Sequence, residues 1–161
     1  TRAAGSKKSF NDYQVGERID HIDGNTICEA DHLFATRLWQ NNSKVHFDIN
    51  AREDKKRLIY GGHIISLVRA LSFNGLENAQ LIVGINGGTH ANPVFAEDTI
   101  YCWSEVLDKI DLNVRNIAAL RLRSLGTKEK NHNMRLKSDD GKYLPTIVLD
   151  FDYWVLVPKE L

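Results

Sequence analysis

Two short stretches of the chain contain the residue types that could do chemistry: a polar run with Asn41 and His46, and a glycine pair, Gly61 and Gly62. Histidine changes its charge near neutral pH and therefore suits proton transfer. The glycine pair opens an apolar helix, whose first backbone N–H groups and dipole can stabilise a developing negative charge. This combination predicts proton transfer beside an oxyanion, with Asn41, His46 and Gly62 as the catalytic residues.

The residues around the glycine pair are candidates for substrate binding. Tyr60 and His63 flank the pair, and Ser66 lies five residues past Gly61 on the same predicted helix. We therefore expect Tyr60, Gly61, His63 and Ser66 to contact a substrate. Two of them also have an ordinary structural explanation, because His63 can be packed or solvated and the Ser66 hydroxyl can bond the carbonyl one turn earlier.

Other polar residues near these stretches have open roles. Asparagine cannot take a proton at pH 7, so Asn41 is expected to orient water or a carbonyl, with His46 as the sole strong base. Asp48 either orients His46 or is a surface carboxylate. Asp31 and His32 could be catalytic, but first-turn and surface roles are more common at such positions. No group of His, Cys, Asp and Glu residues has metal-ligand spacing, so no metal is predicted.

Apolar periodicity predicts the helices that hold these residues. One is expected from Glu29 to Gln40, with a buried face formed by Ala30, Leu33, Phe34 and Leu38. A second is expected from Gly61 to Phe73. It has apolar residues on most of its circumference, which predicts a helix buried on nearly all sides.

Alternation of apolar and polar residues predicts strands in the rest of the chain. They are expected at residues 18–27, with a break at 23–25, and at residues 80–84, 99–107, 116–124 and 147–157. The last is the clearest, with an apolar residue at every second position from Ile147 to Val157. Two helices followed by antiparallel strands indicate an α+β fold, in which a strongly bent sheet wraps around the apolar helix.

Length and composition set the general class. The 161 residues predict a single domain over residues 10–161, preceded by a flexible segment at 1–9. Twenty-one basic residues balance twenty-one acidic ones, so nucleic acid is not predicted as a partner. No apolar run reaches the roughly 18 residues of a membrane span, so no membrane association is expected. Cys28 and Cys102 form no disulfide pattern, which favours a cytoplasmic location.

Arginine and lysine residues offer further binding candidates. The charged connector from Arg52 to Arg57 could hold the phosphates of a nucleotide-tailed substrate, although a solvated connector is more common. Arg37, Arg52 and Arg69 are equal candidates for binding a carboxylate of a substrate.

Three motifs together carry a resemblance to a known family. They are Asn-Asn-Ser-Lys-Val-His-Phe-Asp at 41–48, Tyr-Gly-Gly-His at 60–63 and Asn-Pro-Val-Phe-Ala-Glu-Asp-Thr at 92–99. With them, nearly the whole chain from Phe10 onward resembles the MaoC-like (R)-specific enoyl-CoA hydratases. Further motifs at 12–18, 58–63, 72–76, 103–109 and 140–145 resemble the C-terminal half of mesaconyl-CoA (2-methylfumaryl-CoA) hydratases. Those proteins are usually single chains with two hot-dog units, about twice the length of this chain.

The resemblance implies a hot-dog fold and the activity of a hydro-lyase. Such an enzyme adds water across the double bond of a 2-enoyl-CoA thioester or removes it, here converting mesaconyl-CoA to β-methylmalyl-CoA. The CoA thioester is the substrate and no cofactor is implied. A homodimer or a higher assembly of dimers is expected. The wider family has Asp where this chain has Asn41.

Two other functions remain open. A hot-dog acyl-CoA thioesterase would use the same helix start to polarise the thioester, but would direct water to the carbonyl. A non-catalytic acyl-CoA-binding half would need a partner chain. Asn41 in place of Asp is the feature that keeps this second alternative open.

Overall fold

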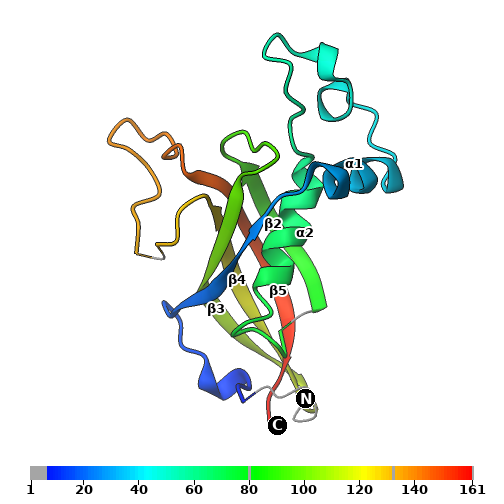
Figure 1. Cartoon of the computed structure of the whole chain (residues 1–161). Helices are drawn as coiled ribbons and strands as arrows, with labels where there is room; N and C mark the ends of the chain where they lie inside the picture. Colours follow the sequence, from blue (N-terminus) through cyan, green and yellow to red (C-terminus); the bar gives the residue numbers. More distant parts are fainter. Residues whose placement is uncertain (1–6, 80, 132, 161) are drawn as a thin grey trace.

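A computed structural model of the chain describes residues 7–79, 81–131 and 133–160. These residues form an antiparallel sheet with the strand order β1-β3-β4-β5-β2 (Figure 1). The strands are β1 (Arg18–Thr26), β2 (Leu81–His90), β3 (Thr99–Val114), β4 (Ile117–Thr127) and β5 (Ile147–Pro158). The helices are α1 (Glu29–Leu38) and α2 (Gly61–Leu71), with short 3₁₀ turns η2 (Phe10–Asp12), η3 (Lys44–His46) and η4 (Ile49–Ala51).

The sheet curves around α2, which lies along one of its faces (Figure 1). Strand β5 buries every second side chain from Ile147 to Val157, as its alternation predicts. From the helix, Ile64 and Val68 are 2% and 0% exposed and belong to the same apolar core. The predicted architecture, α+β with a bent antiparallel sheet around an apolar helix, is confirmed.

Strand β1 joins this sheet at its edge and pairs with β3, so the predicted early strand is part of the same sheet. The break expected at residues 23–25 is a bulge, because the register shifts between Asp20 and Gly24. Ile22 lies inside the bulge with a left-handed backbone, φ 64°. The strand therefore continues through the turn-forming residues instead of ending there.

Helix α2 is less enclosed than its sequence predicts. Ser66 and Ala70 are exposed, and only one side of the helix packs against the sheet. The prediction of burial on nearly all sides is wrong for this single unit, because one sheet can cover only one side of a helix. The apolar residues on the other sides, including Ile65 and Leu67, are only partly covered.

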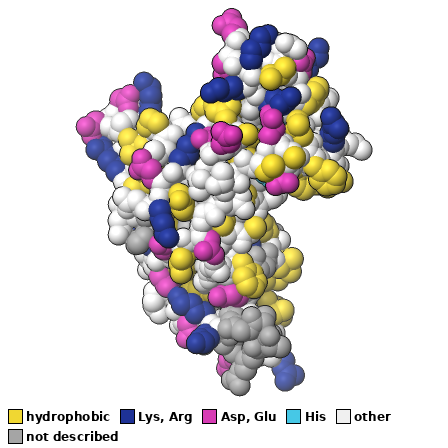
Figure 2. All heavy atoms as spheres, viewed as in Figure 1, with side chains coloured by type: hydrophobic (Ala, Val, Ile, Leu, Met, Phe, Trp, Pro, Cys, Tyr) yellow, Lys and Arg dark blue, Asp and Glu magenta, His cyan; other side chains and the backbone are white. Residues whose placement is uncertain are grey.

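Helix α1 buries a different face from the predicted one. Its buried residues are His32, Ala35 and Thr36, whereas Phe34 and Leu38 are 70% and 60% exposed. Figure 2 shows hydrophobic side chains at the surface in the region of α1. The helix and the lobe after it, residues 39–58, project beyond the sheet, which therefore does not reach the predicted apolar face (Figure 1).

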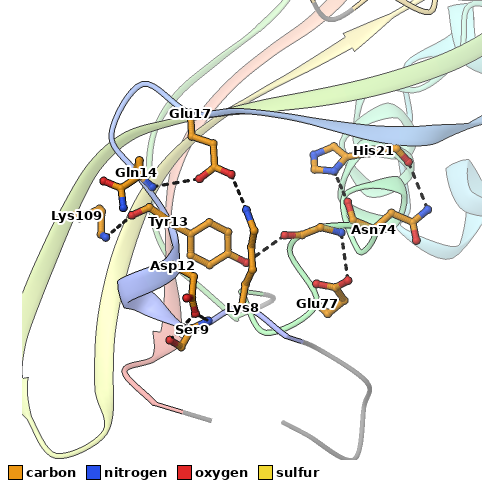
Figure 3. Close-up of polar contacts among 11 residues, drawn as sticks. Lys8, Ser9, Asp12, Tyr13, Gln14, Glu17, His21, Asn74, Glu77 and Lys109 are labelled. Carbon is orange, nitrogen blue, oxygen red and sulfur yellow. Dashed lines mark hydrogen bonds and ion pairs between the residues drawn. The ribbon is translucent and has the colours of Figure 1, made fainter.

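The segment before β1 is held against the body of the molecule by Tyr13 (Figure 3). This side chain is fully buried, and its hydroxyl donates to the carbonyl of Gly75 at 3.1 Å. Lys8 pairs with Glu17 at 2.5 Å, and Ser9 is buried. Of the flexible segment predicted at 1–9, residues 1–6 lie outside the described part. Lys8 and Ser9 belong to the folded domain because these contacts hold them.

A line of hydrogen bonds crosses the core between α2 and the sheet. Successive distances along it are 2.7, 2.8, 2.7 and 2.8 Å, and the side chains in order are Arg69, Tyr153, Ser124, Ser104 and His21. The line ends where Nδ1 of His21 meets the carbonyl of Asn74 at 2.6 Å, a contact that Figure 3 also draws. We call these five side chains the core polar line.

The charge state of His21 sets the direction of the hydrogen bonds in the core polar line. A carbonyl only accepts, so Nδ1 of His21 carries a proton. Burial lowers the pKa of His21, which favours the neutral ring with a lone pair on Nε2. Ser104 then donates to Nε2, and each earlier hydroxyl donates toward His21 while Tyr153 accepts from Arg69. Arg69 is committed here, so the prediction that it could bind a substrate carboxylate is wrong.

Candidate active site

Helix α2 begins directly after Tyr60, whose side chain does not cap it. The first backbone N–H groups of a helix have no acceptor within it, which leaves those of Gly61 and Gly62 available. The N–H of His63 already turns back to the carbonyl of Tyr60 at 2.9 Å. The helix start therefore offers two donors at the positive end of the helix dipole.

Both glycines are required by rings of the chain itself. A Cβ added to Gly61 would lie 2.4 Å from Nε2 of His90, and one added to Gly62 would lie 2.6 Å from Cζ of Tyr60. Neither distance is possible for a real side chain, so any larger residue would displace a ring. The rings of His90 and Tyr60 therefore occupy the space that a side chain at either position would need.

His46 ends the short turn η3 and has one fixed ring nitrogen. Its Nδ1 lies 2.7 Å from the carbonyl oxygen of Leu58. A carbonyl can only accept, so Nδ1 carries the proton and the neutral ring has its lone pair on Nε2. The side chain is partly exposed. His46 can therefore accept a proton from a bound molecule through Nε2 while its ring is held in place.

His32 connects α1 to both halves of the site. Its Nδ1 accepts the N–H of Tyr60 at 3.2 Å, and its Nε2 donates to the carbonyl of His46 at 2.9 Å. The residue is fully buried, and burial lowers its pKa, so it is neutral at pH 7. The sequence left His32 between a catalytic and a surface role. It has neither, since both nitrogens are used to position its neighbours.

The ring of Tyr60 contacts both predicted catalytic parts. Its centroid lies 5.8 Å from that of His46, in an edge-on arrangement, and its phenol end packs on Gly62. Trp39 packs on the same ring at 6.2 Å. The structure thus brings Tyr60, His46 and Gly62 together across a chain separation of sixteen residues. We call Tyr60, His32, His46 and His63 the histidine cluster.

His63 completes this cluster from the first turn of α2. Its ring lies 6.4 Å from that of His32, and it is partly covered. Burial lowers its pKa, which favours the neutral ring at pH 7. Of the two readings of its sequence position, packed or solvated, the structure supports partial packing beside the candidate site.

One hydrogen bond orients the amide of Asn41. Its Oδ1 accepts the N–H of Ser43 at 2.9 Å, which forms a local turn. The NH₂ group is a donor that can hold the oxygen of a water or a carbonyl group. Because an amide takes no proton at pH 7, Asn41 can orient a water but cannot act as its base.

Other predicted residues lie outside the cluster. Ser66 is exposed on α2, and among the described residues no hydrogen bond joins it to the histidine cluster. Asp48 caps η4 by accepting the N–H of Asn50 at 2.9 Å, so the structure assigns it a local role instead of the orientation of His46. Arg52 forms a two-pronged pair with Asp54 at 3.0 and 2.7 Å.

A pocket of about 270 Å³ is lined in part by Gly61 at the start of α2. Its wall is mainly apolar, with Leu58, Ile64 and Val94, and His90 is its ionisable member. Burial lowers the pKa of His90, so the ring is neutral at pH 7. Sequence reasoning missed His90, because no local pattern connects it with Gly61.

No three His, Cys, Asp or Glu side chains gather closely enough to hold a metal ion among residues 7–79, 81–131 and 133–160. Within the same ranges, neither helix has the length and apolar character needed to cross a membrane.

Several known proteins are similar to this chain. The chain is 57% identical over 156 residues to a mesaconyl-CoA hydratase of Cereibacter sphaeroides, covering 97% of this chain and 46% of that protein. It is 52% identical over 161 residues to a β-methylmalyl-CoA dehydratase of Chloroflexus aurantiacus, with the same coverage. A crystal structure named as a MaoC domain protein dehydratase from that organism superposes with a TM-score of 0.93 at 50% identity.

The chain is related to the MaoC-like dehydratases. No family model matches it. A protein of Mycobacterium tuberculosis with a double hot-dog fold superposes with a TM-score of 0.69 at 15% identity, and the chain covers 46% of it. The bent sheet around α2 is therefore the predicted hot-dog fold.

The curated relatives are longer than this chain. The chain spans about half the length of the curated relatives it matches, and 47% of the crystallised MaoC domain protein. A full protein of that kind therefore contains roughly as much chain again as the unit described above.

Proposed function

We propose that the chain is a hydro-lyase unit that hydrates a 2-enoyl-CoA thioester, or dehydrates the corresponding 3-hydroxyacyl-CoA. Mesaconyl-CoA, with β-methylmalyl-CoA as its product, is the proposed substrate because two curated relatives carry those names. The observation that carries the proposal is the open Nε2 of His46, held by the Leu58 carbonyl in the same cluster as Gly62.

The proposed reaction uses His46 as the proton carrier. Nε2 takes a proton from water while the water oxygen forms a bond to the β-carbon of the thioester. The electrons of the double bond move toward the thioester carbonyl, whose oxygen becomes an enolate. The imidazolium of His46 then returns the proton to the α-carbon. Water has been added and His46 is neutral again.

The start of α2 would stabilise the enolate. The N–H groups of Gly61 and Gly62 are donors without a partner in the helix, and the helix dipole adds positive potential there. The NH₂ of Asn41 would hold the attacking water by its oxygen. Tyr60, which contacts His46 and Gly62, would shape the space for the acyl group. These roles are proposals built on the contacts described above.

The assembly is proposed to be a pair of hot-dog units joined along β2. This strand lies at the edge of the sheet, and its alternating residues Leu81, Val83 and Ile85 are 63%, 53% and 64% exposed. An edge strand with a row of exposed apolar side chains is a surface that another strand or sheet would cover. For this chain alone the partner would be a second copy, giving a homodimer.

A second candidate function follows from the length of the relatives. The chain matches about half of each curated relative, and the amide of Asn41 cannot take a proton from the water at pH 7. In that case the chain would be an acyl-CoA-binding half without turnover of its own. A partner chain would then restore activity.

One assay separates these functions. The purified chain is incubated with crotonyl-CoA and with mesaconyl-CoA, while the absorbance of the conjugated thioester and the release of free thiol are followed. We expect the absorbance to fall without free thiol. Release of thiol would instead indicate a thioesterase. Saturable binding without either change, restored to turnover by a partner chain, would indicate the non-catalytic half.

A further inference from the structure

Two segments of the chain run side by side away from the helix start. Residues 55–61 and 90–97 lie antiparallel, joined by the N–H of Ile59 and the carbonyl of Val94 at 2.9 Å. At one end of this ribbon is the apolar pocket beside Gly61. At the other end is a second pocket of about 320 Å³, lined in part by Lys55, Lys56 and Phe95. We call it the connector pocket.

The connector pocket has an apolar floor and a cationic rim. Ile49, Phe95 and Ala96 contribute the apolar surface. Above the ring of Phe95, the Arg52 guanidinium and the Lys56 ammonium lie 5.6 and 5.7 Å from its centroid. Figure 2 shows Lys and Arg side chains over the projecting lobe that holds this pocket. An aromatic surface next to ammonium groups suits a planar base attached to phosphates.

The two lysines keep their charge available. Arg57 is paired with Glu29 at 2.5 Å, and Arg52 with Asp54 at 2.7 Å. In contrast, Lys55 contacts the neutral side chain of Asn50 at 3.2 Å, and no described carboxylate forms an ion pair with either lysine. Glu97 is the other acidic residue of the lining, so Lys55 and Lys56 leave the pocket with a positive balance.

The backbone on both sides of the connector pocket is held in an uncommon conformation. Lys55 and Glu97 both have left-handed backbones, with φ angles of 52° and 75°. Such a conformation is unfavourable for a residue other than glycine and is kept where its surroundings require it. Next to it, the N–H of Lys56 donates to the Asp54 carboxylate at 3.2 Å. The lysine positions are thereby fixed in advance of any ligand.

Building on the proposed function, we propose that the connector pocket binds the nucleotide end of the CoA thioester. The adenine would pack on Phe95, and the phosphates would meet Lys55 and Lys56. The pantetheine arm would then follow the ribbon of residues 55–61 and 90–97 to the start of α2. Lys56 and Gly61 are five residues apart, a span of at most roughly 18 Å, which a linear arm of single bonds can cover.

The test measures binding, so it does not require turnover. The affinities of CoA, dephospho-CoA and pantetheine for the full chain are compared by calorimetry. The same is done for Lys55→Ala/Lys56→Ala and for a control with the same charge change, Lys137→Ala/Lys142→Ala, whose lysines are exposed on another loop. Lys55→Arg/Lys56→Arg keeps the charge and reports on folding effects. We expect the first double variant to bind CoA about tenfold or more weakly.

The pantetheine and salt measurements decide whether Lys55 and Lys56 bind the nucleotide end of CoA. Pantetheine should bind both alanine variants like the unmodified chain, and added salt should weaken CoA binding only where Lys55 and Lys56 are present. Equal CoA affinity in the unmodified chain and the Lys55→Ala/Lys56→Ala variant would overturn the site. So would equal affinity of the unmodified chain for CoA and pantetheine. A chain that binds CoA in this way but hydrates no enoyl thioester would contradict the proposed function and leave the site standing.

Discussion

His21 lies inside a closed line of hydrogen bonds, whereas His46 lies at the open end of one. Both rings donate a hydrogen bond from Nδ1 to a backbone carbonyl, at 2.6 Å for His21 and 2.7 Å for His46. The Nε2 of His21 is then used by Ser104, and the line continues to Arg69. The Nε2 of His46 faces a partly exposed space beside Tyr60.

The difference shows which histidine can take part in a reaction. A ring with both nitrogens used can change its charge only if its neighbours reorganise, which a packed core resists. A ring fixed by one nitrogen keeps its orientation and can still exchange a proton through the other. The core polar line therefore determines how α2 sits on the sheet, and the histidine cluster provides the chemistry at its start.

The largest expected effect is the loss of turnover when the imidazole of His46 is removed. His46→Ala removes the proposed base and should lower kcat/KM by roughly 10²–10⁴ without changing the fold. Enoyl-thioester absorbance measures the rate, and the thermal melting curve serves as the control for folding. A variant with near-full activity would remove His46 from the mechanism.

Breaking the core polar line should lower the stability of the fold. Tyr153→Phe removes one hydroxyl and leaves Ser124 and Arg69 without their shared partner, which should cost about 1–3 kcal/mol in the free energy of unfolding. Urea denaturation measures it. Tyr101→Phe is the matched control, because Tyr101 lies on the same sheet outside the core polar line. Equal loss in both variants would contradict the special role of the line.

The predictability of these regions from sequence differs in a similar way. Strand β5 and the start of α2 were predicted because local periodicity and a glycine pair define them. The exposed Phe34 and Leu38 of α1 were not, since periodicity marks an apolar face without showing what covers it. The links from His32 to Tyr60 and from His90 to Gly61 join residues 28 and 29 positions apart, and no local pattern reports such contacts.

Acid should weaken the fold through its buried histidines. Burial lowers the pKa of His21, His32, His63 and His90 from the model-peptide value of 6.5. The unfolded chain therefore binds more protons than the folded chain below about pH 6.5. Stability should be full above that pH and fall as the pH drops through the lowered values. Urea midpoints at pH 7.5 and 5.5 test this, since the carboxylates titrate at lower pH. Identical midpoints would contradict it.

The smallest expected effect concerns the amide of Asn41, the proposed donor to the water. Asn41→Ala removes one neutral hydrogen bond to the proposed water and should lower kcat/KM by roughly 2- to 10-fold. Its Oδ1 also holds the Ser43 turn, so Asn41→Ser, which can rebuild a local turn, is the control. A loss as large as that of His46→Ala would mean that Asn41 does more than hold water.

Imidazole ¹⁵N spectra of the full chain, recorded while CoA thioester is added, test the contrast between the two histidines most directly. Assignments come from single histidine variants. We expect both rings to carry the proton on Nδ1 in the free chain. We also expect the thioester to shift the Nε2 signal of His46 and to leave that of His21 unchanged. A shift at His21 without a shift at His46 would contradict the proposed role of His46.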